Sequence, residues 1–184
     1  GANRSVTGAD IIRALSSHEA GDYLLVQNET SSVAGAIQKG AEHGMKVVFN
    51  PAPITPEIQG YPLDLVDIFI LNETEAEGLT GKTELDDIRA AMRRQFPKAM
   101  TVLTMGRQGA VCFDAEILHR QPALVVDAVD TTAAGDTFIG FFLAELMGSG
   151  DPARALALGC RAAAICVTRP GASDSIPLRK ELEP

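Results

Sequence analysis

The chain alternates short apolar segments with segments of helical periodicity, and this alternation is the feature that most restricts its fold. An apolar run at 23–27 precedes a helical pattern at 33–42, and a second apolar run follows at 46–50. Two strands joined by a helix within about thirty residues form a right-handed crossover between parallel strands. The unit recurs downstream, from an apolar run at 65–71 to another at 100–104. We therefore expect a three-layer α/β/α fold with a mainly parallel sheet.

Length and charge restrict the domain organisation and the partners. With 184 residues, of which 46% are apolar and 22% charged, the chain is long enough for a single globular α/β domain, residues 1–184. The net charge is −8, and no basic cluster is longer than Arg93-Arg94. Both observations argue against nucleic acid as a partner.

The cysteines and the apolar runs indicate a location. Cys112, Cys160 and Cys166 have neither metal-ligand spacing nor the even count of a disulfide framework. Reduced thiols in a cytoplasmic protein are therefore expected. The longest apolar run near the C-terminus is interrupted by Arg161, and no charged-then-apolar leader opens the chain. We expect neither secretion nor a membrane as partner.

A turn of small residues separates an apolar strand from an apolar helix near residue 130. The predicted strand covers Leu124–Val126, and the helix continues through residues 138–147. Between them, Ala133, Ala134 and Gly135 carry almost no side chain. Their backbone N–H groups can be presented at the start of the helix, where unpaired donors and the helix dipole favour an anion. The turn therefore predicts an anion hole.

One carboxylate, Asp136, lies within this predicted anion hole. The helix start favours its ionised form, which could accept a hydroxyl proton during attack on a phosphoryl group. The alternative is that Asp136 is an ordinary N-cap residue. The small residues before it, and a second carboxylate six positions earlier at Asp130, favour the catalytic interpretation.

Polar residues follow two predicted strands, at the edge where parallel sheets bind ligands. Glu29 comes soon after the strand at 23–27 and is either a substrate contact or a solvated loop residue. Asn72 and Glu75 follow the strand at 65–71. They either cap the next helix, whose first turn is acidic, or hold a hydrated Mg²⁺.

Two loops offer further candidates. Gly106 and Gly109, after the strand at 100–104, either let backbone N–H groups approach a ligand or form a glycine turn into the next strand. The loop 168–175 is rich in turn-forming residues. Its carbonyl groups, together with the Asp130 carboxylate, could hold a monovalent cation, although turns expose carbonyl groups in any protein.

Several of these motifs resemble those of one enzyme family. Residues 130–138 read Asp-Thr-Thr-Ala-Ala-Gly-Asp-Thr-Phe, which is similar to the C-terminal signature of the ribokinase-like (PfkB-type) sugar kinases. Residues 72–81 resemble the family's Asn-x-x-Glu motif, and 104–109 resemble its nucleotide-contacting turn. The segment 167–172 also matches. The Asn-Pro-Ala-Pro turn at 50–53 favours the ribose-specific members over fructokinase-like or adenosine-kinase-like ones.

The resemblance implies a fold, a reaction and a set of roles. The fold is ribokinase-like, and the reaction is ATP-dependent phosphoryl transfer to the primary hydroxyl of a sugar, most specifically D-ribose to ribose 5-phosphate. The partners would be a small-molecule sugar and ATP, with Mg²⁺ and K⁺ as cofactors. The implied residues are Asp136 as base and sugar contact; Glu29 as sugar contact; Ala133, Ala134 and Gly135 in the anion hole; Asn72, Thr104, Gly106 and Gly109 for nucleotide; Asn72 and Glu75 for Mg²⁺; and Asp130, Thr132, Cys166, Arg169, Gly171 and Ser175 for K⁺. In the K⁺ set, Asp130 and Ser175 would bind through their side chains, and the other four residues through main-chain oxygens.

One departure from the family pattern is large. Family members carry a long segment before the point that corresponds to the start of this chain, including a glycine-rich sugar-binding stretch and a small β-sheet lid that also forms the dimer contact. Lid closure excludes water and completes such a site, so sugar turnover by this chain alone is in question. We expect the nucleotide-binding and catalytic portion of a sugar kinase, as a fragment or a natural truncation. A homodimer is expected only if the lid is supplied.

Two other function classes stay open. The first is a catalytically silent nucleotide-binding module, or a half-kinase that needs a partner chain. The second is a dinucleotide-dependent oxidoreductase, because strand–helix–strand repeats also suit that fold. The sequence argues against the second, since no Gly-x-Gly-x-x-Gly follows the first predicted strand and no acidic residue ends the second.

Overall fold

The computed structural model describes residues 2–182 and divides into two compact units. Unit 1 comprises residues 1–102 with 114–116, and unit 2 comprises residues 103–113 with 117–184. The sequence predicts one domain over 1–184, and that interpretation stays a prediction.

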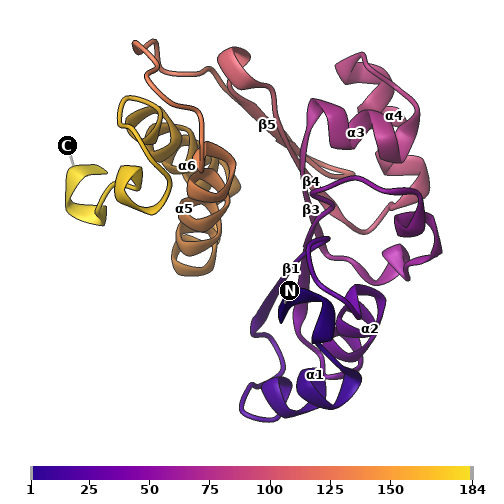
Figure 1. The fold of residues 1–184 in the computed structure, drawn as a ribbon. Helices are drawn as coiled ribbons and strands as arrows, with labels where there is room; N and C mark the ends of the chain where they lie inside the picture. Colours follow the sequence, from indigo (N-terminus) through magenta and orange to yellow (C-terminus); the bar gives the residue numbers. More distant parts are fainter. Residues whose placement is uncertain (1, 183–184) are drawn as a thin grey trace. The chain divides into compact units, whose positions relative to one another are not determined.

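Within residues 2–182, six strands form one sheet, with the strands in sequence order. β1 pairs with β2 and β2 with β3 in parallel, as the predicted crossovers require, whereas β5 and β6 are antiparallel. The α/β class predicted from the sequence is confirmed (Figure 1). The strands are β1 (Tyr23–Gln27), β2 (Lys46–Asn50), β3 (Ile68–Asn72), β4 (Met100–Thr104), β5 (Ala110–Phe113) and β6 (Leu118–Gln121).

In the described part of the chain, six α-helices accompany the sheet, together with short 3₁₀ turns. Side chains cap three of the helices: Thr7 accepts from the Asp10 N–H, Asn72 from the Glu75 N–H, and Asp151 from the N–H groups that follow it. The first two form reciprocal capping boxes. The helices are α1 (Gly8–Leu15), α2 (Val33–Glu42), α3 (Glu73–Thr80), α4 (Leu85–Gln95), α5 (Ala134–Ser149) and α6 (Pro152–Cys166).

The core of unit 1 forms where helices cover its strands. α2 packs on β1 and β2, α1 packs on α2, and α3 packs on β3 and α4 (Figure 1). Phe49 and Phe69 are fully buried, and their rings meet edge to face with centroids 6.4 Å apart. β2 and β3 are buried along nearly their whole length, which explains their unbroken apolar sequences. Their polar residues are therefore concentrated where the strands end.

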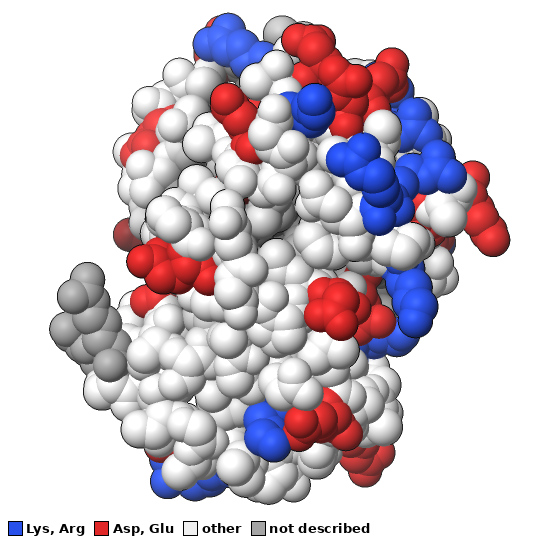
Figure 2. Space-filling view, turned by 90° about the vertical axis from the view of Figure 1, so that its right-hand side faces the viewer, with Lys and Arg blue, Asp and Glu red and all other residues white. Residues whose placement is uncertain are grey.

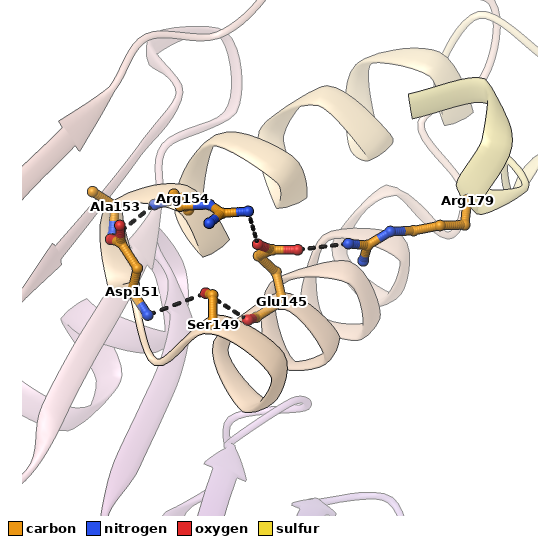
Figure 3. Close-up of polar contacts among 6 residues, drawn as sticks. All are labelled: Glu145, Ser149, Asp151, Ala153, Arg154 and Arg179. Atoms are coloured by element: carbon orange, nitrogen blue, oxygen red, sulfur yellow. Dashed lines mark hydrogen bonds and ion pairs between the residues drawn. The ribbon is translucent and has the colours of Figure 1, made fainter. Parts of the chain in front are cut away.

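Unit 2 is built on a close helix pair. α5 and α6 lie side by side, and α6 also packs on β5 and β6 (Figure 1). Gly159 of α6 makes the contact close, because a Cβ atom there would lie 2.9 Å from the Phe138 ring. Glu145 of α5 is 7% exposed and pairs with two arginines, Arg154 of α6 at 3.0 Å and Arg179 of the C-terminal 3₁₀ turn η6 (Arg179–Leu182) at 2.6 Å (Figure 3).

The structure corrects two predicted strands, one that does not form and one that begins later than predicted. The predicted strand Leu124–Val126 is wrong, because residues 122–129 form no strand and Val125 is fully exposed. Three β-branched or aliphatic residues satisfy strand propensity, but a strand also needs a hydrogen-bonded neighbour. The strand predicted at 65–71 begins at Ile68, since Leu63–Leu65 forms a 3₁₀ turn.

The surface carries charges of both signs. On the face of the molecule in Figure 2, Lys and Arg side chains are interspersed with Asp and Glu. Within residues 2–182, no helix combines the length and the apolar content that crossing a bilayer needs.

Candidate functional site

The start of α5 lies where the sequence predicts an anion hole. Ala133 precedes the helix in the left-handed conformation, with φ at 61°, an uncommon state for a residue with a side chain. Among the described residues, no side chain caps this helix start. Gly135 is exposed, and a Cβ added to it would meet no atom within 4 Å. Contacts within the described part of the chain therefore do not require glycine at this position, and the space around it is open.

Asp136 lies in the first turn of α5 and is exposed. The next residue, Thr137, is buried, and its hydroxyl donates to the thiol of Cys166 at 3.4 Å. The same Cys166 sulfur lies 3.1 Å from the Ser175 hydroxyl and 3.7 Å from the Thr132 carbonyl oxygen. Side chains from three segments of unit 2 thus meet beneath the start of α5.

The Asp130 carboxylate joins two loops near this helix start. One oxygen accepts from the Thr132 N–H at 2.9 Å, and the other accepts from the Gly171 N–H at 3.1 Å. Hydrogen bonds from Thr132, and the N–H of Gly171, hold the pKa of Asp130 below its ordinary value. The N–H groups of Val129 and Asp130 both donate to the Val167 carbonyl. The turn before α5 is therefore tied to the loop after α6.

The residues of the predicted K⁺ set are brought close together within unit 2. Asp130 bonds to Gly171, the Cys166 thiol bridges Thr132 and Ser175, and the Cys166 carbonyl accepts from the Arg169 N–H at 3.0 Å. One carboxylate among several carbonyl groups is a donor set that suits a hard monovalent cation. Among the described residues, no group of three His, Cys, Asp or Glu side chains could hold a metal ion.

Asn72 and Glu75 interact with each other at the start of α3. The Asn72 side chain accepts from the Glu75 N–H at 2.9 Å and donates to Glu75 Oε1 at 2.8 Å. The Glu75 carboxylate also accepts from the Asn72 N–H at 2.9 Å. The capping interpretation is thus satisfied. Glu75 is only 6% exposed, and this burial raises its pKa. Asn72 is exposed, so it is the member of the pair that a ligand can reach.

Asn50 and Gln27 extend this pair across the sheet edge, and no role was predicted for either. Asn50 Nδ2 donates to Glu75 Oε2 at 3.1 Å, and Asn50 Oδ1 accepts from Gln27 Nε2 at 3.0 Å. The two residues end β2 and β1, as Asn72 ends β3. A polar residue that closes an apolar strand was the signal available in the sequence.

The turn at 104–109 holds its two glycines for different reasons. Gly109 has φ at 94°, and a Cβ there would lie 2.0 Å from the Gln121 carbonyl oxygen. Close packing inside unit 2 therefore requires this glycine. Gly106 has φ at 49°, is exposed, and has open space around its Cβ position. Of the two, Gly106 is the one whose surroundings leave room for a nucleotide beside Thr104.

Glu29 lies in an exposed turn two residues after β1. Its neighbour Asn28 holds the turn in place, because the Asn28 amide donates to the Pro53 carbonyl at 2.7 Å and to Thr55 at 3.2 Å. The side-chain oxygen Oδ1 of Asn28 accepts from the Tyr61 hydroxyl at 2.9 Å. The loop after β2 is thereby fixed against the end of β1.

Comparison with known proteins decides the family. A family model described as "pfkB family carbohydrate kinase" matches residues 11–179. The chain belongs to the pfkB family of carbohydrate kinases. It is 37% identical over 183 residues to a deoxyribokinase of Salmonella typhi, covering 96% of this chain and 60% of the relative. It is 41% identical over 169 residues to a ribokinase of Haemophilus influenzae, covering 87% and 54%.

Solved structures of pfkB-family proteins share the fold. A ribokinase of Thermotoga maritima gives a TM-score of 0.82 at 32% identity, over 99% of this chain and 61% of that one. A fructokinase double mutant of Vibrio cholerae, solved with fructose, ADP and a potassium ion, gives a TM-score of 0.82 at 26% identity, over 96% and 63%. The chain thus spans about 60% of the length of the deoxyribokinase it matches.

In this pfkB-family chain, each unit brings together its own set of predicted residues. In unit 1, Asn72 and Glu75 are in contact, and Glu29 lies beyond the end of β1. In unit 2, the start of α5 adjoins the predicted K⁺ set through Thr137 and Cys166. The turn at 104–109 also belongs to unit 2.

Proposed function

We propose that this pfkB-family chain supports ATP-dependent phosphoryl transfer to the primary hydroxyl of a sugar, with D-ribose as the substrate. The start of α5 carries the proposal, because no side chain of the described residues caps it, its residues Gly135 and Asp136 are exposed, and the Cβ position of Gly135 is open. A helix N-terminus of this kind suits a phosphate group. The names of the relatives, deoxyribokinase and ribokinase, favour a pentose.

The proposed roles follow the geometry of that turn. Asp136 accepts the proton of the attacking sugar hydroxyl, and the backbone N–H groups from Ala133 to Asp136 stabilise the charge that develops on the phosphoryl oxygens. Preorganised donors of this kind are typically worth about 3–4 kcal/mol each in the transition state. Glu29 contacts the sugar, and Thr104 and Gly106 contact the nucleotide, with Gly109 shaping that turn.

Two cations complete the proposal. Mg²⁺ would be held through Asn72 and Glu75, and would supply positive charge beside the phosphates. K⁺ would be held by the Asp130 carboxylate, the Ser175 side chain and neighbouring carbonyls, where this chain already ties the loops together. The cytoplasmic location, the absence of nucleic-acid and membrane partners, and a homodimer completed by a lid remain predictions.

A second candidate is a nucleotide-binding chain without turnover of its own. The share of the relatives that this chain spans, 60% for the deoxyribokinase, favours this alternative. It predicts that ATP binds but that no sugar is phosphorylated unless a further polypeptide is added.

Calorimetric titration with a non-hydrolysable ATP analogue and Mg²⁺ tests the proposal, first in K⁺ and then in Na⁺. We expect binding that weakens without K⁺. Gly135→Ala should weaken it at least tenfold, because the new methyl group faces the ligand. Gly140→Ala is the matched control, since it lies in the same helix and its Cβ position is equally open. No binding by a folded chain in either salt contradicts the proposal.

A coupled assay with ATP and ribose, 2-deoxyribose or fructose then separates the two candidates. Turnover of a pentose supports the kinase, and Asp136→Asn should abolish most of it while ATP still binds. Binding without turnover of any sugar favours the silent module. Near-normal turnover by Asp136→Asn removes that residue from the role of base.

A further inference from the structure

A chain of amide and carboxylate side chains runs across the ends of three neighbouring strands in unit 1. Gln27 Nε2 donates to Asn50 Oδ1 at 3.0 Å, and Asn50 Nδ2 donates to Glu75 Oε2 at 3.1 Å. Glu75 Oε1 in turn accepts from Asn72 Nδ2 at 2.8 Å. This series of hydrogen-bonded side chains therefore extends from β1 through β2 to the exposed Asn72 at the end of β3.

Capping of α3 does not account for this arrangement, as the other capping box in unit 1 shows. At α1, Thr7 and Asp10 form the same reciprocal box, with the Asp10 side chain 40% exposed and paired to Arg13 of its own helix. At α3, the Glu75 carboxylate is buried and takes a further donor from another strand. Burying a carboxylate costs free energy that a cap alone does not need.

The position of Asn50 requires the two hydrogen-bond donors of its side-chain amide, and not only a side chain of its shape. Its two amide hydrogens are directed to the Ile70 carbonyl at 2.9 Å and to Glu75 at 3.1 Å, while its carbonyl oxygen accepts from Gln27. Asn50 is itself 6% exposed. An aspartate of the same shape would place acceptors opposite two acceptors, so the position selects a donor toward Glu75.

We propose that Asn50 is a positioning residue, which fixes the Glu75 carboxylate and through it the Asn72 side chain for contact with the Mg²⁺–nucleotide complex. The proposal rests on the function proposed above. Glu75 Oε1 accepts from the Asn72 side chain, whereas Oε2 accepts from both the Asn72 N–H and the Asn50 amide. With the Asn50 amide removed, the carboxylate keeps only its contacts to Asn72, and the contact that ties it to β2 is lost. Residues that hold a metal ligand in place without touching the metal typically change metal affinity by about 10–100-fold when they are replaced.

The test measures how Mg²⁺ changes the affinity of the complete chain for a non-hydrolysable ATP analogue. For Asn50→Ala we expect the Mg²⁺-dependent gain in affinity to fall about tenfold. The affinity measured without Mg²⁺ should be nearly unchanged. Asn50→Asp keeps the shape but loses the donor, so it should lose the gain to at least the same extent. Asn50→Gln, which retains an amide donor, should recover part of it.

Asn28→Ala is the matched control. Asn28 follows β1 directly in unit 1 and makes three side-chain hydrogen bonds, to Pro53, Thr55 and Tyr61, and within the described residues none of these bonds reaches Glu75. A metal-free readout accompanies the titration. The NMR signals of the Asn72 side-chain amide should move in Asn50→Ala and stay in place in Asn28→Ala.

Each outcome has a separate meaning. If the unmodified chain binds the analogue with no response to Mg²⁺, the metal part of the proposed function fails. If it responds and Asn50→Ala responds equally, the positioning role is overturned. An equal loss in Asn28→Ala overturns it as well, because the effect is then general. If Asn50→Ala does not fold, Asn50→Asp and Asn50→Gln decide by the difference between them.

Discussion

At the scale of single residues, Asp130 shows how one carboxylate organises the loops around α5. Its two oxygens accept hydrogen bonds from Thr132 and Gly171, which come from opposite ends of the helix pair in the sequence. These bonds require the ionised form, which is why the pKa of Asp130 is lowered. The folded state therefore binds a proton at Asp130 less readily than the unfolded chain does.

This difference predicts an acid dependence of stability. A lowered pKa gives a contribution that is complete above the ordinary value of 3.8 and is lost as the pH falls through the folded value. The free energy of unfolding should therefore differ between the unmodified chain and Asp130→Asn by a constant amount near pH 7. The difference should shrink below about pH 4. Urea unfolding between pH 7 and pH 3 measures it.

The exposed Asp127→Asn, three positions earlier, is the control for a general change of charge. This comparison separates the loss of the two hydrogen bonds of Asp130 from the loss of one negative charge. A difference for Asp130→Asn that stays constant down to pH 3 contradicts the assignment of these hydrogen bonds.

Individual residues were predictable where their role is local. The Thr7 and Asn72 caps follow from sequence spacing, because donor and acceptor lie three residues apart. Gly109 could not be assigned in this way. Its neighbour is the backbone at 121–123, and only the folded chain brings that segment within 2.0 Å of its Cβ position. Asn50 was missed for the same reason, since Glu75 is twenty-five residues away.

At the scale of elements, the ion-pair cluster around Glu145 beside the α5–α6 contact has members that differ in exposure to solvent (Figure 3). The side chain of Glu145 is 9% exposed, whereas those of Arg154 and Arg179 are 69% and 55% exposed. The buried member of the cluster is therefore the carboxylate. If it loses its partners it is left unpaired away from water, while an arginine that loses Glu145 can turn to solvent.

The difference in exposure between Glu145 and its two arginines predicts which variant lowers the free energy of unfolding more. The double variant Arg154→Ala with Arg179→Ala should lower the free energy of unfolding by about 2–3 kcal/mol, because it leaves the buried carboxylate without its charged partners. Glu145→Gln should cost less, since a neutral amide can stay buried at lower cost and still hydrogen bond. Urea unfolding of the three chains measures the order. A larger loss in Glu145→Gln than in the double variant contradicts this account.

Elements with their own periodicity were predicted well. The strands at 23–27, 46–50 and 100–104 agree with the structure to the residue, because a short apolar run bounded by turn residues defines each one. The predicted strand at 124–126 was wrong because pairing is a property of two segments and is absent from the sequence of one. The predicted role of the 72–75 segment as a cap was confirmed, whereas its link to β2 depends on tertiary structure.

At the scale of the whole molecule, the chain consists of two compact units, and a long exposed segment leads from β6 to α5. Residues 122–129 form no helix or strand, and Val125 and Val129 are 102% and 67% exposed. Neither the two units nor this segment was predicted, since both depend on which distant residues touch. Apolar side chains on exposed irregular backbone are what proteases recognise.

Limited proteolysis should therefore begin in this segment. Thermolysin, which cleaves before bulky apolar residues, should first cut within 122–129 and give fragments that meet there. Mass spectrometry of the early products identifies the bond. Val125→Asp with Val126→Asp should slow this first cut, because it removes the side chains the enzyme binds. An initial cut inside a strand or helix contradicts the prediction.

The exposed segment also divides the molecule in a useful way. Glu29, Asn72 and Glu75 precede it, whereas Asp130 and Asp136 follow it. Expression of residues 1–123 and 124–184 as separate polypeptides would leave the predicted nucleotide and Mg²⁺ residues on the first piece and the predicted K⁺ set on the second, with the predicted sugar contacts Glu29 and Asp136 divided between them. Because α6 packs on β5 and β6, the second piece has an apolar surface with which to reassemble on the first. The chain is thus suited to fragment complementation, in which α6 packs on β5 and β6 again when the two pieces associate.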